Sequence, residues 1–146
     1  MKLDILAISA HPDDIELSCS GTLIAHKSQG YTTGILDLTE GEMSTRGTIE
    51  TRQKESAEAS QIMGLSLREN LGLSDAKFDL SFENQLRVIK VLRKFRPEII
   101  LANALYDRHP DHVRAAELIE EAVFKSGLVK IETEGEKGIQ SPWRPK

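Results

Sequence analysis

The chain has 146 residues, 39% of them hydrophobic, which is enough for one domain with its own core. Its 19 basic and 23 acidic residues give a net charge of -4, and no basic stripe indicates binding to nucleic acid or anionic lipid. No run approaches the roughly 20 apolar residues that span a bilayer, and the N-terminal apolar run is too short for a signal peptide. The lone Cys19 excludes an internal disulfide and a cysteine-cluster metal site. We therefore expect a cytoplasmic protein with no nucleic-acid or membrane partner.

Short apolar runs alternate along the chain with longer segments whose apolar residues recur at helical spacing. The apolar runs predict strands at residues 3–9, 31–39, 66–73 and 98–105. The longer segments predict helices at residues 12–30, 48–64, 81–97 and 110–127. Glycine or proline ends each predicted helix, as at Gly30 and Pro97. The polar residues 128–146 predict no further element.

Strands that alternate with helices of this length predict an α/β protein with helices on both faces of a parallel sheet. We expect a Rossmann-like, doubly wound, three-layer fold with strand order 3-2-1-4. In that order the first and fourth strands are neighbours, and their carboxyl ends flank the crevice where ligands usually bind. The predicted domain spans residues 1–127. Residues 128–146 are expected to be a polar tail, or the start of a C-terminal portion that is missing from this chain.

Two similar segments follow these two strands, HPDD at residues 11–14 and HPDH at residues 109–112. Pro12 and Pro110 suit the first turn of a helix, and acidic side chains in that turn complement the helix dipole. Helix capping alone would therefore explain any one of the aspartates. It does not explain why three of the chain's four histidines stand in these two segments.

A metal site explains the histidines and the aspartates together. His11 and Asp14 stand three positions apart, as do the two histidines of HPDH, so each pair lies roughly on one side of a helical turn. Two histidine nitrogens and one carboxylate oxygen form a typical zinc ligand set that leaves a fourth position open for water. Such a site lowers the pKa of bound water to about 7 and polarises a carbonyl. Our ligand choice is His11, Asp14 and His112, with zinc as the metal and ferrous iron as the alternative.

The remaining polar residues of the two segments are candidate catalytic groups. Asp13 is the candidate general base, because a carboxylate close to the attacking water can accept its proton. His109 could donate a hydrogen bond or a proton to the developing oxyanion and the leaving group. Asp111 would fix the orientation or the charge of His109. The combination predicts hydrolysis of an amide or an ester.

With AHPDD after the first strand and HPDH after the fourth, the sequence resembles the PIG-L/LmbE-like family of zinc-dependent N-acetylglucosaminide deacetylases. It is most similar to the branch that deacetylates GlcNAc-malate in bacillithiol biosynthesis. The segments that carry this branch resemblance are LDLTEGEMSTRGT (36–48), TRQKE (51–55), ENLGL (69–73), DRHPDH (107–112), SGLVKIET (126–133) and WRPK (143–146). The resemblance implies the same three ligands, Asp13 as the base, and His109 as the acid or oxyanion stabiliser.

The resemblance also implies residues that bind the substrate. Arg52 matches a position that contacts sugar hydroxyls, although a solvated arginine on a helix face is the alternative. Arg108 could bind an acidic aglycone such as malate through a bidentate contact, or it could form a surface ion pair. The loop after the second strand is expected to line the sugar pocket with Glu42, Met43, Ser44 and Arg46.

The chain departs from the family pattern in three respects. The family usually has a Gly-rich segment where this chain has SCSGT, residues 18–22, in which only Gly21 remains. Some members carry a tyrosine two residues before the first histidine of HPDH, and that position is Asp107 here. Family members also continue beyond the point that corresponds to Lys146.

We predict a deacetylase that acts on a small-molecule amino sugar such as GlcNAc-malate and that forms a homo-oligomer. One alternative is a receiver-like phosphoacceptor domain, which needs an aspartate at the end of the third strand and a fifth strand. Asp75 is only loosely placed for that role, and the alternative leaves the three histidines unexplained. A second alternative is a metal-binding remnant without activity.

Overall fold

The computed structural model describes all residues from Met1 to Lys146. Its centre is a sheet of four parallel strands in the order β3-β2-β1-β4. The strands are β1 (Ile5–Ser9), β2 (Thr33–Thr39), β3 (Leu67–Leu73) and β4 (Ile99–Ala102). The predicted fold class and strand order are thereby confirmed.

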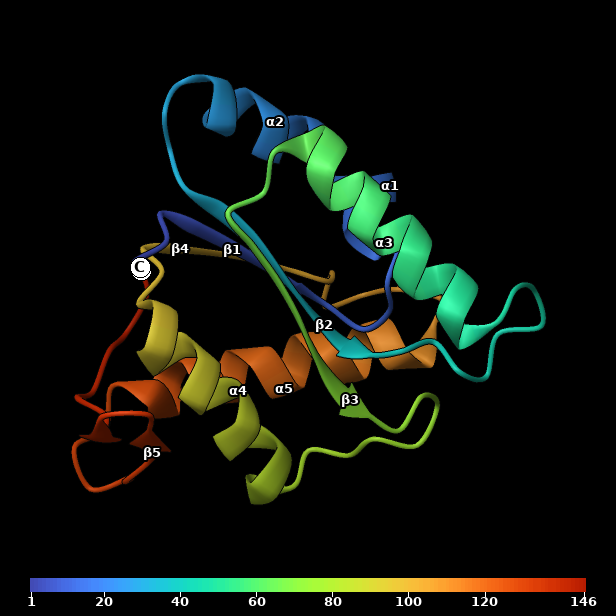
Figure 1. Ribbon diagram of the computed structural model, residues 1–146. Coiled ribbons are helices and arrows are strands. Elements are labelled where there is room, and N and C mark those ends of the chain that lie inside the picture. Colours follow the sequence, from blue (N-terminus) through green and yellow to red (C-terminus); the bar gives the residue numbers. More distant parts are fainter.

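Helices cover both faces of the sheet and give the predicted three layers (Figure 1). One layer holds α1 (Asp14–Ser18), α2 (Ser20–Ser28) and α3 (Ile49–Met63). The other layer holds α4 (Phe82–Phe95) and α5 (Pro110–Ser126). No helix is both long and apolar enough to cross a membrane.

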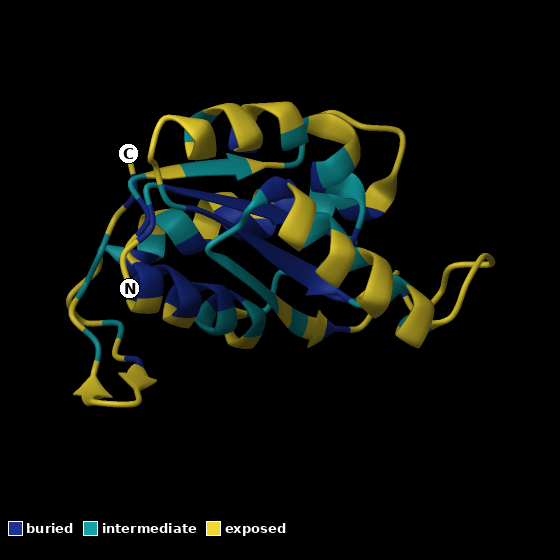
Figure 2. Cartoon of the chain, turned by 45° about the horizontal axis from the view of Figure 1, so that its top comes forward, coloured by how far each residue is buried: buried dark blue, intermediate teal, exposed yellow.

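The core has two parts because the side chains of each strand alternate between the two faces. Leu6 and Ile8 of β1 point to the α4 and α5 side, where they join a cluster of 17 buried residues. Ile5 and Ala7 point to the other side, where a cluster of 6 buried residues includes Ile15 of α1. The helices α4 and α5 therefore cover the main core. Figure 2 shows the central strands in the colour of buried residues, and every residue of β1 and β2 is buried.

Two predicted elements differ from the structure close to the carboxyl ends of β1 and β4. The helix predicted at 12–30 is two helices, α1 and α2, that meet at Cys19. Ser18 and Ser20 donate their hydroxyls to the carbonyls of Asp14 and Glu16 in the preceding turn, at 2.6 and 2.8 Å. Hydroxyls that bond backward in this way compete with regular helix geometry. The SCSGT segment is therefore the place where one helix passes into the next.

The strand predicted at 98–105 ends at Ala102. The next residue, Asn103, turns its amide toward the amino-terminal segment. Its Oδ1 accepts a hydrogen bond from the Ala10 N–H at 3.0 Å, and its Nδ2 donates to Asp14 at 3.3 Å. The side chain of Asn103 thus ties the ends of β1 and β4 together, where the prediction continued the strand.

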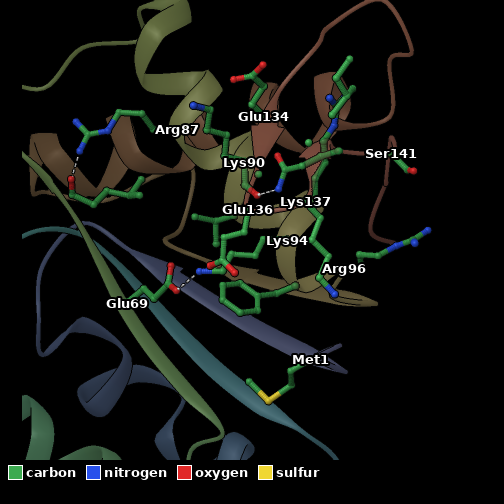
Figure 3. A pocket seen from close by; sticks show the side chains of 18 residues that line it. Met1, Glu69, Arg87, Lys90, Lys94, Arg96, Glu134, Glu136, Lys137 and Ser141 are labelled. Carbon is green, nitrogen blue, oxygen red and sulfur yellow. Dashed lines mark hydrogen bonds and ion pairs between the residues drawn. The ribbon is translucent and has the colours of Figure 1, made fainter.

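Residues 128–146 contain a short hairpin, β5 (Glu134–Gly135) and β6 (Gly138–Ile139), although no element was predicted there. Arg93 of α4 anchors this segment and is only 4% exposed. Its guanidinium donates to the carbonyls of Ser126, Leu128 and Ile131 and to the hydroxyl of Thr133. The hairpin, α4 and the edge of β3 enclose a groove of about 900 Å³, in which Lys94 pairs with Glu69 at 2.9 Å (Figure 3).

A buried ion-pair cluster links β2, β3 and α1. The Arg68 guanidinium donates to both oxygens of Asp37, at 2.8 and 3.1 Å, and to Glu16 at 2.5 Å. The Arg68 and Asp37 side chains are 10% and 4% exposed. Burial raises the pKa of the Asp37 carboxyl to about 6, although its hydrogen bonds with Arg68 act in the opposite direction.

Candidate active site

The two HPD segments meet in one cavity of about 370 Å³. The cavity lies at the carboxyl ends of the strands, as expected for ligand sites in open α/β sheets. Its lining consists of His11, Asp13, Asp14, Gly41, Met43, Ser44, Arg52, Asp75, Ala76, His109 and His112. Eight of the residues predicted for the site therefore line one cavity, and one of them is Arg52, a helix residue from the middle of the sequence.

The three predicted metal ligands lie close together. Ligand atoms of His11, Asp14 and His112 all lie within 4.8 Å of one another. Nδ1 of His11 is 3.7 Å from Oδ2 of Asp14, and Nε2 of His112 is 3.1 Å from Oδ1 of Asp14. The Asp14 carboxylate thus lies between one nitrogen of each ring.

The other nitrogen of each ring faces a different carboxylate. Nε2 of His11 lies 3.1 Å from Asp75 and 3.3 Å from Asp111, and Nδ1 of His112 lies 3.0 Å from Asp107. Histidines that bind metals commonly have this arrangement, in which a carboxylate holds the ring nitrogen that does not bind. The nitrogens near Asp14 are therefore the ones available to a metal ion.

A second group, made of His11, His109 and Asp111, also has its ligand atoms within 4.8 Å. Its donors already have partners inside the protein. The Asp111 carboxylate, 4% exposed, accepts from the Ala76 N–H and from Arg114, and Nδ1 of His109 accepts from the Asp111 N–H. The group of His11, Asp14 and His112 therefore fits a divalent cation better. Two imidazoles and a carboxylate are also donors that zinc prefers.

Asp13 and Asp14 are adjacent in sequence, but their carboxylates have different partners. Asp14 accepts hydrogen bonds from the His11 N–H at 3.1 Å and from Asn103. The Asp13 carboxylate, half exposed, lies 3.2 Å from the Arg52 guanidinium. Asp13 precedes α1 and makes no capping hydrogen bond with its side chain. A capping role therefore does not explain its carboxylate.

The backbone of Asp13 has a φ of 142°, a region that residues with a side chain rarely adopt. Strained residues of this kind cluster at functional sites, where surrounding contacts hold them in place. Here the contact of Asp13 with Arg52 from α3 provides such a restraint. The Arg52 guanidinium also donates to the Pro12 carbonyl at 3.3 Å.

The charges of the site shift the pKa values of its groups. Burial alone would lower the pKa of His11, but its hydrogen bonds and ion pairs with Asp14, Asp75 and Asp111 raise that pKa to about 9. Burial raises the pKa of the Asp13 carboxyl, against the nearby positive charge of Arg52. For Asp14, burial acts upward too, but hydrogen bonds with His11 outweigh it and lower the pKa. A base with a raised pKa and a ligand with a lowered one suit the two roles predicted for these aspartates.

His109 and Asp111 occupy the site in a different relation from the one predicted. We predicted that Asp111 would fix the orientation or the charge of His109, and the Asp111 backbone N–H does donate to Nδ1 of His109 at 3.2 Å, whereas its carboxylate has other partners. The Asp111 carboxylate contacts His11, Ala76 and Arg114, and His109 is an exposed residue that caps α5 through that bond from Asp111. The His109 ring stacks on His112, with ring centroids 4.6 Å apart. Stacking on His112 and the hydrogen bond from the Asp111 N–H therefore position His109, while the Asp111 carboxylate belongs to the surroundings of His11.

The loop after β2 contributes only part of what was predicted. Met43 and Ser44 line the cavity, whereas Glu42 accepts a hydrogen bond from the Asp75 N–H at 2.7 Å and Arg46 is exposed. Arg108 is exposed and does not line the cavity. The structure therefore gives Glu42 a role in holding the Asp75 segment.

Two residues of the site were missed by the sequence reasoning. Asp75 contacts His11 and accepts from the Met43 N–H at 2.9 Å, and Asn103 contacts Asp14. Asp75 comes shortly after β3, and Asn103 directly follows β4. Polar residues at the carboxyl ends of all four strands, and not only at HPD motifs, were the signal that could have identified them.

The PIG-L family, described as GlcNAc-PI de-N-acetylase, matches residues 6–123. This match covers most of the chain, so the chain belongs to the PIG-L family, as the sequence resemblance indicated. The diacetylchitobiose deacetylase of Thermococcus kodakarensis is 31% identical over 134 residues, which are 85% of this chain and 50% of that protein. A probable N-acetyl-alpha-D-glucosaminyl L-malate deacetylase 2 of Bacillus anthracis is 26% identical over 132 residues, with 82% and 58% covered.

The conserved protein TT1542 from Thermus thermophilus, a solved structure, superposes with a TM-score of 0.90 at 48% identity. The match covers 98% of this chain and 63% of that one. A 4-oxalmesaconate hydratase of Pseudomonas putida is 28% identical over 130 residues, with 80% of this chain and 50% of that protein covered. The chain thus spans between half and three fifths of the length of these curated relatives.

Proposed function

We propose that this chain carries the catalytic centre of a zinc-dependent hydrolase that removes the acetyl group from an N-acetylated amino sugar. The observation that carries the proposal is that the carboxylates of two adjacent aspartates have different surroundings. Asp14 stands with two histidines in a three-donor group, and Asp13 stands beside that group without belonging to it. Deacetylases among the relatives support the same reaction class.

His11, Asp14 and His112 would hold the metal. A zinc ion bound there would acidify a water molecule and polarise the amide carbonyl. Asp13 would accept the proton of the water that attacks the carbonyl carbon. His109, an exposed residue of the cavity lining whose Nδ1 accepts from the Asp111 N–H, would donate a hydrogen bond from Nε2 to the developing oxyanion. The proton taken up by Asp13 would pass to the sugar nitrogen as the C–N bond breaks. The products are acetate and a free amine.

The substrate proposed for this site is GlcNAc-malate. Arg52 lines the cavity while it contacts Asp13, so its remaining N–H groups are available to sugar hydroxyls. Arg108 does not line the cavity, but it directly precedes the HPDH segment. Its guanidinium suits the carboxylates of malate. We propose an amino sugar of this kind as the partner of the site. We also propose that the metal is zinc, that the protein forms a homo-oligomer and that it is cytoplasmic.

Metal content and acetate release test the proposal directly. The chain should bind about one zinc ion by elemental analysis, and it should release acetate from GlcNAc-malate faster than from GlcNAc-inositol or free GlcNAc. Asp14→Ala should lose both the metal and the activity, because it removes the ligand that lies between the two histidines. Diacetylchitobiose and 4-oxalmesaconate should also be assayed, because two relatives are named for these substrates.

Three outcomes would contradict the proposal. Absence of bound divalent metal in the intact chain would remove its basis. Metal binding without acetate release from any N-acetyl sugar would favour a metal-binding remnant. Hydration of 4-oxalmesaconate without deacetylation would place the chain with its hydratase relative. The receiver-like alternative has no support, because the sheet has four strands and the family match is to PIG-L proteins.

Gly41 provides a prediction about Arg52. Gly41 has a φ of 66°, and a Cβ at this position would collide with the Arg52 guanidinium. Gly41→Ala should therefore displace Arg52 from Asp13 and lower kcat/KM about tenfold or more, with a stability loss of about 1–2 kcal/mol from the left-handed backbone. Gly72→Ala is the matched control, because Gly72 has a φ of 59° and open space around it. Equal losses of activity in the two variants would contradict the assigned contact.

A further inference from the structure

Asp107 lies two residues before His109, and its carboxylate contacts both histidines of the HPDH segment. One oxygen, Oδ1, accepts a hydrogen bond from the backbone N–H of His109 at 2.9 Å. The other, Oδ2, lies 3.0 Å from Nδ1 of His112. Nε2 of the same ring lies 3.1 Å from Asp14. The His112 ring is therefore held between two carboxylates, one at each nitrogen.

The chemistry of the carboxylate determines which nitrogen carries the proton. An ionised carboxylate only accepts hydrogen bonds, so Asp107 favours an N–H at Nδ1 of His112, and Asp14 favours one at Nε2. A cation bound by Asp14 would occupy the lone pairs of that carboxylate, so Asp107 would then decide which nitrogen carries the proton. A neutral ring has one such donor, and its other nitrogen then carries a free lone pair. With the proton on Nδ1, the lone pair on Nε2 points toward Asp14 and the three-donor group.

We propose that Asp107 is a positioning residue that fixes His112 in its Nδ1–H form and so presents Nε2 to the metal ion. The inference rests on the metal centre of the proposed function. Two further contacts keep the geometry fixed. The hydrogen bond from the His109 N–H orients the Asp107 carboxylate. The His109 ring stacks on the His112 ring at an interplanar angle of 17°. His112 is thus restrained by its face as well as by its edge.

Asp107→Asn separates this role from support of the loop. The asparagine carbonyl can still accept from the His109 N–H, but its NH₂ group would then face Nδ1 of His112. A donor at that place favours the lone pair on Nδ1 and the proton on Nε2. In this tautomer Nε2 has no lone pair with which to bind the metal ion. We expect a 10- to 100-fold weaker affinity for zinc, measured by competition with a chromogenic chelator. The ¹⁵N shifts of the neutral His112 ring in the metal-free protein should move toward the Nε2–H pattern, because Asp14 is then the only carboxylate that faces the ring.

Asp79→Asn is the matched control. Asp79 accepts from the backbone N–H two residues further on, at Ser81, as Asp107 does from His109, but Asp79 lies outside the cavity lining. The control should keep wild-type zinc affinity. Asp107→Glu should restore most of the affinity lost in the asparagine variant, because a longer carboxylate can still accept from Nδ1.

The readouts distinguish failure of the inference from failure of the proposed function. If the wild type binds no zinc, the proposed function fails, while the nitrogen shifts of His112 still test the tautomer. If the wild type binds zinc and Asp107→Asn binds it equally well with an unchanged tautomer, the inference is wrong. If Asp107→Asn does not fold, the glutamate variant decides, since wild-type shifts and affinity support the role and their loss contradicts it.

Discussion

Asp13→Asn is expected to lower kcat for deacetylation by about 10²- to 10⁴-fold, the range typical for a general base, and to leave the metal content unchanged. The asparagine keeps the size of the side chain but cannot accept a proton from water. The metal should remain, because the Asp13 carboxylate contacts Arg52 and not the group of His11, Asp14 and His112. Acetate release and elemental analysis on the same preparation measure both quantities.

Asp14→Ala is the comparison that gives this result its meaning. It removes a donor of the three-residue group, so metal and activity should fall together. If Asp13→Asn lost its metal as well, Asp13 would be a ligand, and the roles assigned to the two neighbours would be wrong. If it kept both metal and full activity, another group would have to accept the proton.

Arg68→Ala is expected to destabilise the fold by about 3–5 kcal/mol, because it leaves the buried Asp37 carboxylate without its cation. Glu16 would lose its partner at the same time. Urea unfolding of the variant and the wild type gives the difference in free energy of unfolding. Lys94→Ala is the control, since the Lys94–Glu69 pair is much more exposed and should contribute no more than about 1 kcal/mol.

The loss caused by Arg68→Ala should depend on pH. Burial raises the pKa of Asp37 in the folded protein to about 6, above its ordinary value of 3.8. The folded chain therefore holds this proton more tightly than the unfolded chain, and the resulting stabilisation is complete below 3.8 and lost as the pH rises through about 6. Without Arg68 the folded pKa lies higher still. The destabilisation should thus be larger at about pH 7 than at about pH 5, and an equal or opposite trend would contradict the assignment.

Much of the site could be predicted because strand order in α/β proteins follows general rules. Once the first and fourth strands are neighbours, the residues that follow them must meet at one edge of the sheet. His11 and His112 are about a hundred residues apart in the chain, yet their ring centroids are 5.5 Å apart. Residue chemistry then restricted the ligands to a few combinations.

The remainder depended on contacts between side chains and the backbone, which periodicity does not describe. Asn103 ends β4 through its bonds to Ala10 and Asp14, although its neighbours continue an apolar run. Arg93 lies in a helix of the expected pattern, but its four bonds to residues 126–133 hold a segment that the sequence described only as polar. The contact of the Asp111 carboxylate with His11 was not predicted for the same reason, because it depends on where Ala76 and Arg114 lie.

The backbone conformation of Asp13 lowers the stability of the fold at a residue that the proposed activity requires. Alanine normally stabilises a folded chain more than glycine does, because glycine loses more conformational freedom on folding. At a φ of 142° the order should reverse, since only glycine adopts this angle without strain of about 1–3 kcal/mol. Asp13→Gly should therefore melt at a higher temperature than Asp13→Ala, although both variants lack the base. The aspartate is held in a conformation that favours glycine, so improving the stability of this turn would remove its chemistry.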